Sequence, residues 1–434
     1  MARIQATAQA QSTQMSRPLA SRGVFARNDQ IVAAASHIDE ARLNRGRLER
    51  LRTVIKSYDC AGVLLADPMN IRYATGTRNM AIWTLHSPGR YVFVPTEGPV
   101  VMFEFATSMH LDRGNPLIDE LRPSTSFFYF MAGSRSGEKA QAWAAEIFDL
   151  VQTYGGGNRR LGVDRCDPLG AFALQQLGLS LFDAQEPLEL ARAIKSPDEL
   201  AAMAVSMAVC DLGCEAMRQN LRPGITENQL WAILHDANIA HNGEWIECRL
   251  LASGPRTNPW FQECSDRVIQ AGDVVGFDTD MVGPFGYLSD ISRSYICPDE
   301  GYGSPAASDE IRHYTQLAQE QVLFNAELIR PGMGFREFAK KSWQVPEEFL
   351  ANRYMSMVHG VGLVDEYPSI ACAMDFADWG YDGVFEANMV VSVESYIGRV
   401  GGGCGIKMEQ QVLITETGAI PMSNLPFADS LMIV

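Results

Sequence analysis

The segment FDTDMVGPFGYLSDISRSY, residues 277–295, constrains the fold most because it places three carboxylates around one predicted β-hairpin. β-Branched and aromatic residues flank a turn that contains Gly and Pro, a pattern typical of two paired strands. Asp278 and Asp280 are two residues apart, so we expect both side chains on one face of the first strand, with Asp290 on the returning strand. Because unpaired buried charges are very costly, the three aspartates should either face solvent or bind metal.

Two strand-like segments and one histidine nearer the C-terminal end offer further ligands. Glu394 lies within VVSVESYI and Glu409 within GIKMEQQVLITE, and the apolar neighbours make a solvated position unexpected for either. His359, in MVHGVGL, is the one histidine of seven with a glycine-lined, strand-like setting. Taken singly, His359 could be an ordinary core histidine and each acid an ordinary turn or edge residue. Together, the five carboxylates and one imidazole suit divalent Mn, Fe, Co or Zn, and two ions could share bridging carboxylates.

The pattern along the chain predicts two domains. Residues 1–25 are polar and rich in Ala, Gln and Ser, and we expect them to be flexible. From 26 to 188, helical and strand patterns alternate as in an α/β domain, beginning with the amphipathic helix EARLNRGRLERLRTVIKSYD. A second domain, 189–434, opens with a helix at KSPDELAAM, where Ser196 suits the N-cap and Pro197 the first helical position. Later, LRPGITENQL and IRPGMGFREF each follow one predicted helix and open another, which favours a duplicated half-domain over a chance match.

The net charge and the cysteine pattern limit the possible binding partners and the cellular compartment of the protein. A formal net charge of −16 argues against a nucleic-acid or anionic-membrane partner, because both surfaces would repel the chain. Nine scattered cysteines without a C-x-x-C pair indicate reduced thiols in a cytoplasm. We find neither a signal-peptide stretch near the start nor a run of about 18 apolar residues, so we expect no membrane span.

The order Asp, Asp, His, Glu, Glu resembles the two-metal signature of the creatinase, prolidase and aminopeptidase P superfamily. GDVVGFDTD with GYLSDISRSY is similar to its two-aspartate hairpin, VHGVGLVDEYP to its histidine loop, and ADPMNIRYATG to its N-terminal domain. Over about residues 40–434, the resemblance implies an α/β (α+β) protein, with a creatinase-like N-terminal domain followed by a C-terminal pita-bread metal-binding domain with pseudo-twofold symmetry. It also implies a homodimer and a divalent metal site with two ions, iron favoured and zinc or manganese possible. The expected ligands are Asp278, Asp280, Asp290, His359, Glu394 and Glu409.

Two departures separate this chain from the peptidases of that superfamily. Peptidase relatives carry one further histidine before the first aspartate, where this chain has ASGPRTNPWFQECSD with Trp260 or a neighbour at that place. They carry another after the ligand histidine, where this chain offers Asp365 and Glu366 in GLVDEYP. Without both imidazoles, the proton transfers of peptide hydrolysis should slow by several orders of magnitude. These departures and the additional Asp280 resemble the pita-bread dimethylsulfoniopropionate (DMSP) lyases of the DddP type.

That resemblance implies β-elimination of DMSP to dimethyl sulfide and acrylate. Asp365 would be the general base, with Glu366 as its competitor, while metal at the substrate carboxylate would stabilise the developing charge. Trp83 and Tyr354 would hold the sulfonium group by cation–π attraction, although packing explains either residue too. The alternatives are a metal-dependent Xaa-Pro aminopeptidase or prolidase, a metal-free creatinase-like hydrolase, and a non-catalytic pita-bread binding protein. The complete ligand set argues against the last two.

Overall fold

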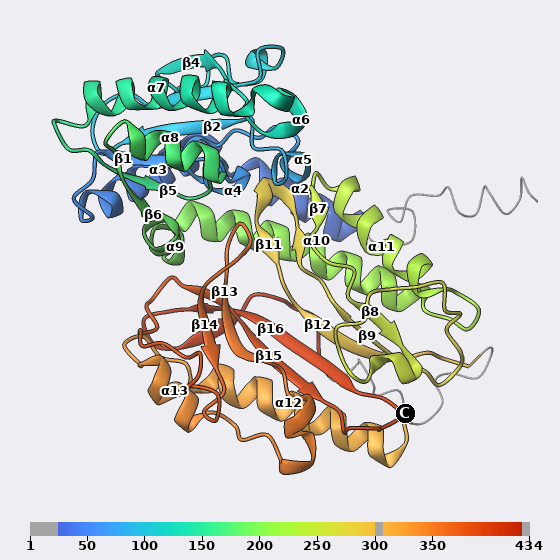
Figure 1. Ribbon diagram of the computed structural model, residues 1–434. Coiled ribbons are helices and arrows are strands. Elements are labelled where there is room, and N and C mark those ends of the chain that lie inside the picture. The colour runs from blue at the N-terminus through green and yellow to red at the C-terminus, as the bar shows by residue number, and fades with distance from the viewer. Residues whose placement is uncertain (1–24, 300–306, 428–434) are drawn as a thin grey trace, which may run out of the picture. The chain divides into compact units, whose positions relative to one another are not determined.

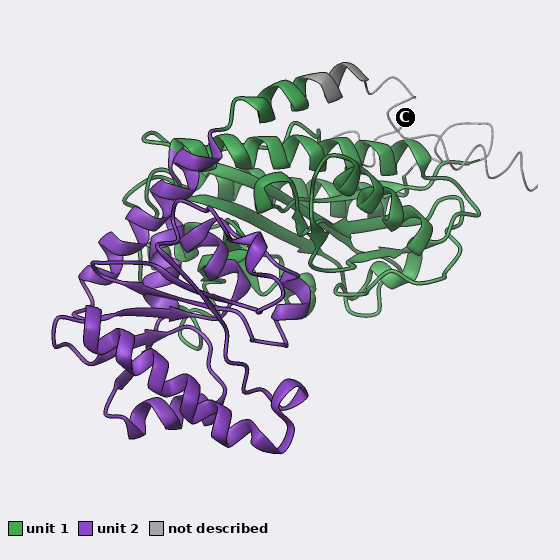
Figure 2. Ribbon diagram, turned by 90° about the horizontal axis from the view of Figure 1, so that it is seen from above, with its two compact units in different colours: residues 1–38, 197–434 green, residues 39–196 purple. Residues whose placement is uncertain are grey.

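The computed structural model describes residues 25–299 and 307–427, with side chains described from residue 30 onward. The segment 1–25, predicted to be flexible, lies outside the described residues except for its last position. The chain forms two compact units (Figures 1 and 2). The N-terminal unit comprises residues 39–196, and the C-terminal unit comprises the described residues on either side of that range. Each unit has its own sheets and its own hydrophobic core.

The units divide at a slightly different place from the predicted domains. The predicted domain boundary, between residues 188 and 189, falls inside the helix Gln185–Ala193. The two units divide instead between Ser196 and Pro197. Residues 26–38, which the sequence pattern places in the first domain, group with the C-terminal unit. The helix Gln185–Ala193 therefore belongs wholly to the N-terminal unit.

The N-terminal unit is built on one mixed six-stranded sheet (Figure 1). In order across the sheet, the strands are β4 (Glu120–Pro123), β3 (Val101–Glu104), β2 (Tyr91–Pro95), β1 (Gly62–Leu65), β5 (Arg160–Val163) and β6 (Ser180–Asp183). The helices are α3 (Glu40–Lys56), α4 (Pro68–Thr75), α5 (Ala81–Thr84), α6 (Tyr129–Ala132), α7 (Ser136–Tyr154), α8 (Pro168–Gln176) and α9 (Gln185–Ala193). Strands β2 and β3 form an antiparallel pair, and helices and strands alternate along this unit as the sequence pattern predicts.

Local sequence explains these elements. The side chain of Asp39 accepts a hydrogen bond from the Arg42 backbone N–H and so caps α3, whose leucines repeat at helical spacing on the buried face. In β1, Leu64 belongs to the same buried hydrophobic cluster as Trp143 of α7, and its neighbour Val63 is also buried. The central strand is therefore apolar throughout, as expected for a sheet covered on both faces.

The C-terminal unit contains three small sheets (Figure 1). One sheet has the order β12 (Ser292–Ile296), β9 (Val274–Asp278) and β8 (Leu251–Ser253). A five-stranded sheet has the order β14 (Asp365–Ala371), β13 (Ser356–Val361), β15 (Val390–Ile397), β16 (Ile406–Ile414) and β17 (Ala419–Pro421). The third consists of β11 (Leu288–Ser289), β10 (Met281–Val282) and β7 (Trp245–Ile246). The helices are α2 (Phe25–Ser36), α10 (Pro197–Asn220), α11 (Glu227–Ala240), α12 (Asp309–Leu328) and α13 (Phe335–Lys341).

Helices α10 and α12 are the two longest helices described in this unit. Helix α10 begins at Pro197, as predicted, and is long and apolar enough to cross a membrane by length and composition alone. However, 72% of its apolar window is buried inside the structure, which identifies it as a core helix. Helix α12 packs against β15 and β16, and Figure 1 shows α12 and α13 on one side of the five-stranded sheet.

The two Arg-Pro-Gly phrases occupy matching positions, which supports the predicted duplication. Gly224 follows α10 and Gly332 follows α12, and both adopt positive φ angles, 89° and 84°. The Gly224 N–H donates a hydrogen bond to the Ile269 carbonyl, and the Gly332 N–H donates to the Phe385 carbonyl. In both copies, the N–H of the partner residue donates back to the residue after the glycine. The same turn therefore leads into α11 in one half and into α13 in the other.

The aspartate hairpin differs from the prediction in one respect. Strand β9 ends at Asp278, and Asp280 lies beyond it with a φ angle of 33°. The expectation that both side chains project from one continuous strand is therefore wrong, because a positive φ turns the chain out of the extended conformation. The next residues pair with β7 and β11 in a separate sheet. Asp278 lies opposite Ser292 in the β9–β12 pair, with Asp290 just before β12.

Candidate metal centre

Five of the predicted ligands converge in the C-terminal unit. Asp278 ends β9, Asp290 precedes β12, and His359 lies in β13. Glu394 of β15 and Glu409 of β16 are directly paired across the sheet, so both side chains lie on the same face. Within three overlapping groups, the possible ligand atoms lie no more than 4.8 Å from one another. These groups are Asp290, His359 and Asp365; His359, Glu394 and Glu409; and Asp278, Asp290 and Glu409.

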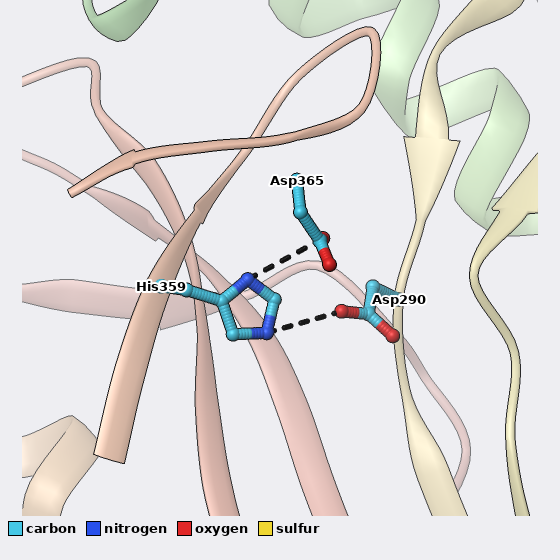
Figure 3. Close-up of side chains that lie close together, drawn as sticks. All are labelled: Asp290, His359 and Asp365. Atoms are coloured by element: carbon cyan, nitrogen blue, oxygen red, sulfur yellow. Dashed lines mark ion pairs between the residues drawn. The ribbon is translucent and has the colours of Figure 1, made fainter. Parts of the chain in front are cut away.

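His359 lies at the centre of this arrangement. Its Nε2 atom is 3.3 Å from Asp290 Oδ2, 3.4 Å from Glu394 Oε1 and 3.5 Å from Glu409 Oε1. On its other side, Nδ1 is 3.4 Å from Asp365 Oδ1, and Figure 3 shows the imidazole ring between the carboxylates of Asp365 and Asp290. One ring nitrogen carries at most one proton and cannot satisfy three carboxylates. A cation would satisfy all of them.

Two buried oxygen atoms give an independent test of whether a metal fits. Among the described residues, Asp290 Oδ1 and Glu409 Oε1 are buried without a hydrogen-bond partner. Unpaired buried carboxylate oxygens are strongly unfavourable, and metal coordination is a usual way of satisfying them. The donor set of carboxylate oxygens and one imidazole also suits a divalent cation. The residues therefore fit a metal, as the sequence predicts.

The pKa values of the acids reflect the same crowding. Burial, followed by repulsion from neighbouring carboxylates, raises the pKa of Asp290 well above its ordinary value. Burial also raises the pKa of Asp278, and the Lys407 ammonium opposes this shift. For Glu409, burial acts in the same direction, but Lys407 and His359 outweigh it and hold the pKa well below its ordinary value. In the absence of metal, the raised pKa values of Asp278 and Asp290 therefore make their ionised forms less favourable than those of exposed aspartates.

Lys407 is a site residue that the sequence analysis missed. Its fully buried ammonium group lies 2.6 Å from Glu394 Oε2, 3.1 Å from Asp278 Oδ2 and 3.3 Å from Glu409 Oε2. It also donates a hydrogen bond of 2.7 Å to the hydroxyl oxygen of Ser292. The signal in the sequence was its place two residues before Glu409 on a strand, which puts both side chains on one face. Lys407 neutralises part of the acidic cluster.

Replacing this ammonium group should weaken the metal-free protein. Lys407→Met keeps most of the side-chain volume but leaves three buried carboxylates without their cation, which should cost up to about 3–5 kcal/mol. Urea unfolding of protein dialysed against a chelator measures the effect. Lys407→Arg is the matched control, because it retains the charge. An unchanged unfolding midpoint for Lys407→Met would contradict the stabilising role of the ammonium group.

Asp280 lies beside the close groups of ligand atoms and is not a member of any of them within the described part of the chain. Its side chain is half-buried and interacts with the Cys248 thiol. Burial, together with repulsion from Asp365, raises the pKa of Asp280 to about 7. Its role as a ligand stays a prediction.

Asp365 and Glu366 occupy different environments although they are adjacent. Asp365 is the first residue of β14, contacts His359 and keeps 54% of its side chain exposed. The carboxylate of Glu366 is buried against the backbone of Gly362. Partial burial and the carboxylates of Glu409 and Glu366 raise the pKa of Asp365, while His359 opposes the shift. Asp365 thus combines access from solvent with contact to the metal-binding cluster.

Aromatic side chains border the cluster within the C-terminal unit. The Tyr354 ring centroid lies 4.6 Å from Lys407 Nζ and 5.4 Å from the centroid of the Phe261 ring. Trp260 is buried, and its ring centroid lies 6.0 Å from Lys407 Nζ. The segment in which peptidase relatives carry a histidine therefore supplies two aromatic rings near the site. Trp83 belongs to α5 of the N-terminal unit, where its ring meets Phe105 edge-on.

Comparisons with known proteins agree with the predicted fold class. The sequence profile of the creatinase/prolidase N-terminal domain matches residues 47–194, and that of metallopeptidase family M24 matches residues 201–416. Among solved structures, an Xaa-Pro dipeptidase from Bacillus anthracis has the same fold, with a TM-score of 0.70 over 90% of this chain and 100% of that chain. Its sequence identity is 21%. The α/β domain followed by a pita-bread domain is therefore confirmed.

Two curated relatives share much more sequence with the chain. Dimethylsulfoniopropionate lyase DddP of Roseovarius nubinhibens is 40% identical over 399 residues, which are 91% of this chain and 88% of the relative. The protein of the same name from Roseobacter denitrificans is 39% identical with the same coverage. With both domain profiles matched and this similarity extending over nine-tenths of its length, the chain belongs to the creatinase and M24 metallopeptidase family, and within it to the DddP type.

Proposed function

We propose that this protein is a carbon–sulfur lyase that uses a divalent metal to cleave DMSP into dimethyl sulfide and acrylate. The observation that carries the proposal is its 40% identity to a DddP lyase over 91% of the chain. The site is consistent with this chemistry, because Asp365 lies at the open edge of the cluster and aromatic residues stand near it. A β-elimination needs a base and a group that stabilises the negative charge developing on the carbon next to the carboxylate. It does not need a water molecule as nucleophile.

The residues of the site would have separate roles in this reaction. Asp365 would take the proton from the carbon beside the substrate carboxylate, and the released electron pair would form the carbon–carbon double bond. The carbon–sulfur bond would break at the same time, so that its electron pair leaves with dimethyl sulfide. A bound metal would act as a Lewis acid toward the substrate carboxylate. Two ions are proposed, iron first and zinc or manganese next, held by Asp278, Asp290, His359, Glu394 and Glu409, with Asp280 as an additional ligand.

Removal of metal provides the direct test of the function. Purified protein with DMSP should release dimethyl sulfide and equimolar acrylate, and chelation should reduce the release to background. Headspace gas chromatography measures the gas, and adding back Fe²⁺, Zn²⁺ or Mn²⁺ separately identifies the competent ion. Release that survives complete removal of metal would contradict the metal role. Cleavage of an Xaa-Pro dipeptide without any release of dimethyl sulfide would favour the peptidase alternative.

We also propose a cytoplasmic homodimer that pairs through the N-terminal unit. Tyr129 and Phe130 of α6 are each 77% exposed, and exposed aromatic groups of this kind often mark protein–protein contacts. All nine cysteines lie within the described residues as free thiols, which supports a reducing compartment. Trp83 is a further proposed contact to the sulfonium group. Light scattering of the purified protein tests the dimer.

A further inference from the structure

Phe261 combines two features that ordinary packing does not explain. The residue is 58% exposed, and its backbone has a φ angle of 70°. Bulky residues rarely adopt a positive φ, and an exposed ring contributes little burial to offset the strain. Strained residues of this kind cluster at functional sites. The strained and exposed position of Phe261 is therefore consistent with a functional role.

The neighbours of Phe261 connect it to the metal-binding cluster. Its ring stacks on Tyr354 with a centroid distance of 5.4 Å and an angle of 28° between the planes. Tyr354 in turn lies 4.6 Å from the ammonium group of Lys407, which contacts three of the clustered carboxylates. The Tyr354 ring thus already has a cation over it and a second ring against it. Most of the aromatic surface that an incoming group can reach in this pair belongs to Phe261.

The chemistry of the proposed substrate matches this surface. DMSP is a zwitterion whose carboxylate and sulfonium sulfur are separated by two methylene carbons. With the carboxylate at the metal centre, the sulfonium group would extend toward the border of the site, where Tyr354 and Phe261 lie. A sulfonium or quaternary ammonium group has no N–H or O–H to donate, so proteins bind it chiefly through aromatic faces and negative potential. The acidic cluster supplies the potential, and Phe261 supplies an open face.

We propose that Phe261 is a specificity-determining residue, whose ring receives the onium group of the substrate while Tyr354 supports it from behind. This inference rests on the proposed lyase function and extends it to a ligand class, the propanoates that carry a small permanent cation at carbon 3. Phe261 contributes to substrate affinity and leaves the proton transfer by Asp365 unchanged.

Two probes of the same shape isolate the contribution of the positive charge. 3-(Trimethylammonio)propanoate and 4,4-dimethylpentanoate differ only in a cationic nitrogen in place of a neutral carbon. Calorimetric titration of the metal-loaded protein gives the dissociation constant of each. Phe261→Leu should weaken the cationic probe about 2- to 30-fold and change the neutral probe less than about 2-fold. Phe261→Tyr should retain the affinity of the wild-type protein, because it keeps the aromatic face.

A matched surface variant and the DMSP kinetics complete the test. Phe324→Leu replaces another half-exposed phenylalanine of the same unit, in α12, and should change neither dissociation constant. With DMSP as substrate, Phe261→Leu should raise KM by the same factor as the cationic probe and leave kcat within about 2-fold. A change in KM without a change in kcat distinguishes the loss of a substrate contact from a general loss of structure.

The outcomes separate this inference from the proposed function. Equal weakening of both probes by Phe261→Leu would show simple apolar contact and overturn the inference, as would no change in either. If the wild-type protein releases no dimethyl sulfide, the proposed function fails. The charge-selective binding of the two probes then still decides whether Phe261 recognises an onium group.

Discussion

Asp365→Asn is expected to lower kcat for dimethyl sulfide release by about 10²- to 10⁴-fold while the bound metal stays in place. The amide keeps the size and polarity of the side chain but cannot accept the proton of the substrate. Asp365 is suited to this role because it is half-exposed and its carboxylate lies 3.4 Å from His359 Nδ1. Gas chromatography gives the rate, and mass spectrometry of the same sample gives the metal content.

Glu366→Gln is the matched control for this variant, since it makes the same chemical change one residue along the chain. The buried Glu366 carboxylate packs against Gly362, so its replacement should cost stability without removing the proton acceptor. Two results for Asp365→Asn would require a different assignment. Turnover at the wild-type rate would exclude Asp365 as the base. Loss of metal together with turnover would identify Asp365 as a ligand, in keeping with its position in one of the close groups.

Asp290→Ala is expected to remove metal and activity together. Even outer residues of metal sites contribute about 10- to 100-fold to affinity, so loss of a direct ligand should exceed this range. Asp290 takes part in two of the three close groups of ligand atoms, and its Oδ1 atom has no hydrogen-bond partner among the described residues. Metal content after dialysis and the rate of dimethyl sulfide release are the two measurements.

For the thermal stability of Asp290→Ala, we expect one result without metal and a different result with metal. Without metal, burial and repulsion from neighbouring carboxylates outweigh the contact of Asp290 to His359, so removal of the acid should leave the melting temperature unchanged or raise it. In the presence of metal, the wild-type protein should be stabilised and the variant should not. Asp378→Ala, at an exposed aspartate of the same unit, should bind metal as the wild-type protein does. Full metal occupancy in Asp290→Ala would remove Asp290 from the proposed ligand set.

Much of the fold follows from patterns that are local in the sequence. The leucine spacing of residues 40–56 specifies an amphipathic helix, and Pro197 after Ser196 marks the start of α10. The repeated Arg-Pro-Gly phrase requires the same glycine turn in both halves, because a positive φ is open to glycine without steric cost. Such signals act over a few residues and do not depend on distant contacts, so they can be read without a structure.

The clustering of most candidate ligands was also predictable, although for a different reason. Asp290, His359, Glu394 and Glu409 each stand in apolar surroundings where an unpartnered charge would be unfavourable, and the structure brings their side chains together. Asp280 shows the limit of this reasoning. Its spacing from Asp278 predicts a shared strand face only if the strand continues, and the turn at φ 33° depends on pairing with β7 and β11.

The sequence by itself determined the two-domain α/β and pita-bread fold, the family, and the residues that gather as candidate ligands. Only the tertiary structure decided which groups surround them. Lys407 reads as an ordinary lysine until β16 places its ammonium group among three carboxylates, and Phe261 reads as an ordinary apolar residue until its ring is seen exposed beside Tyr354. The reason is physical: local patterns record backbone preference and burial, whereas charge pairing and ring stacking depend on residues that are distant in sequence and meet only when the sheets assemble.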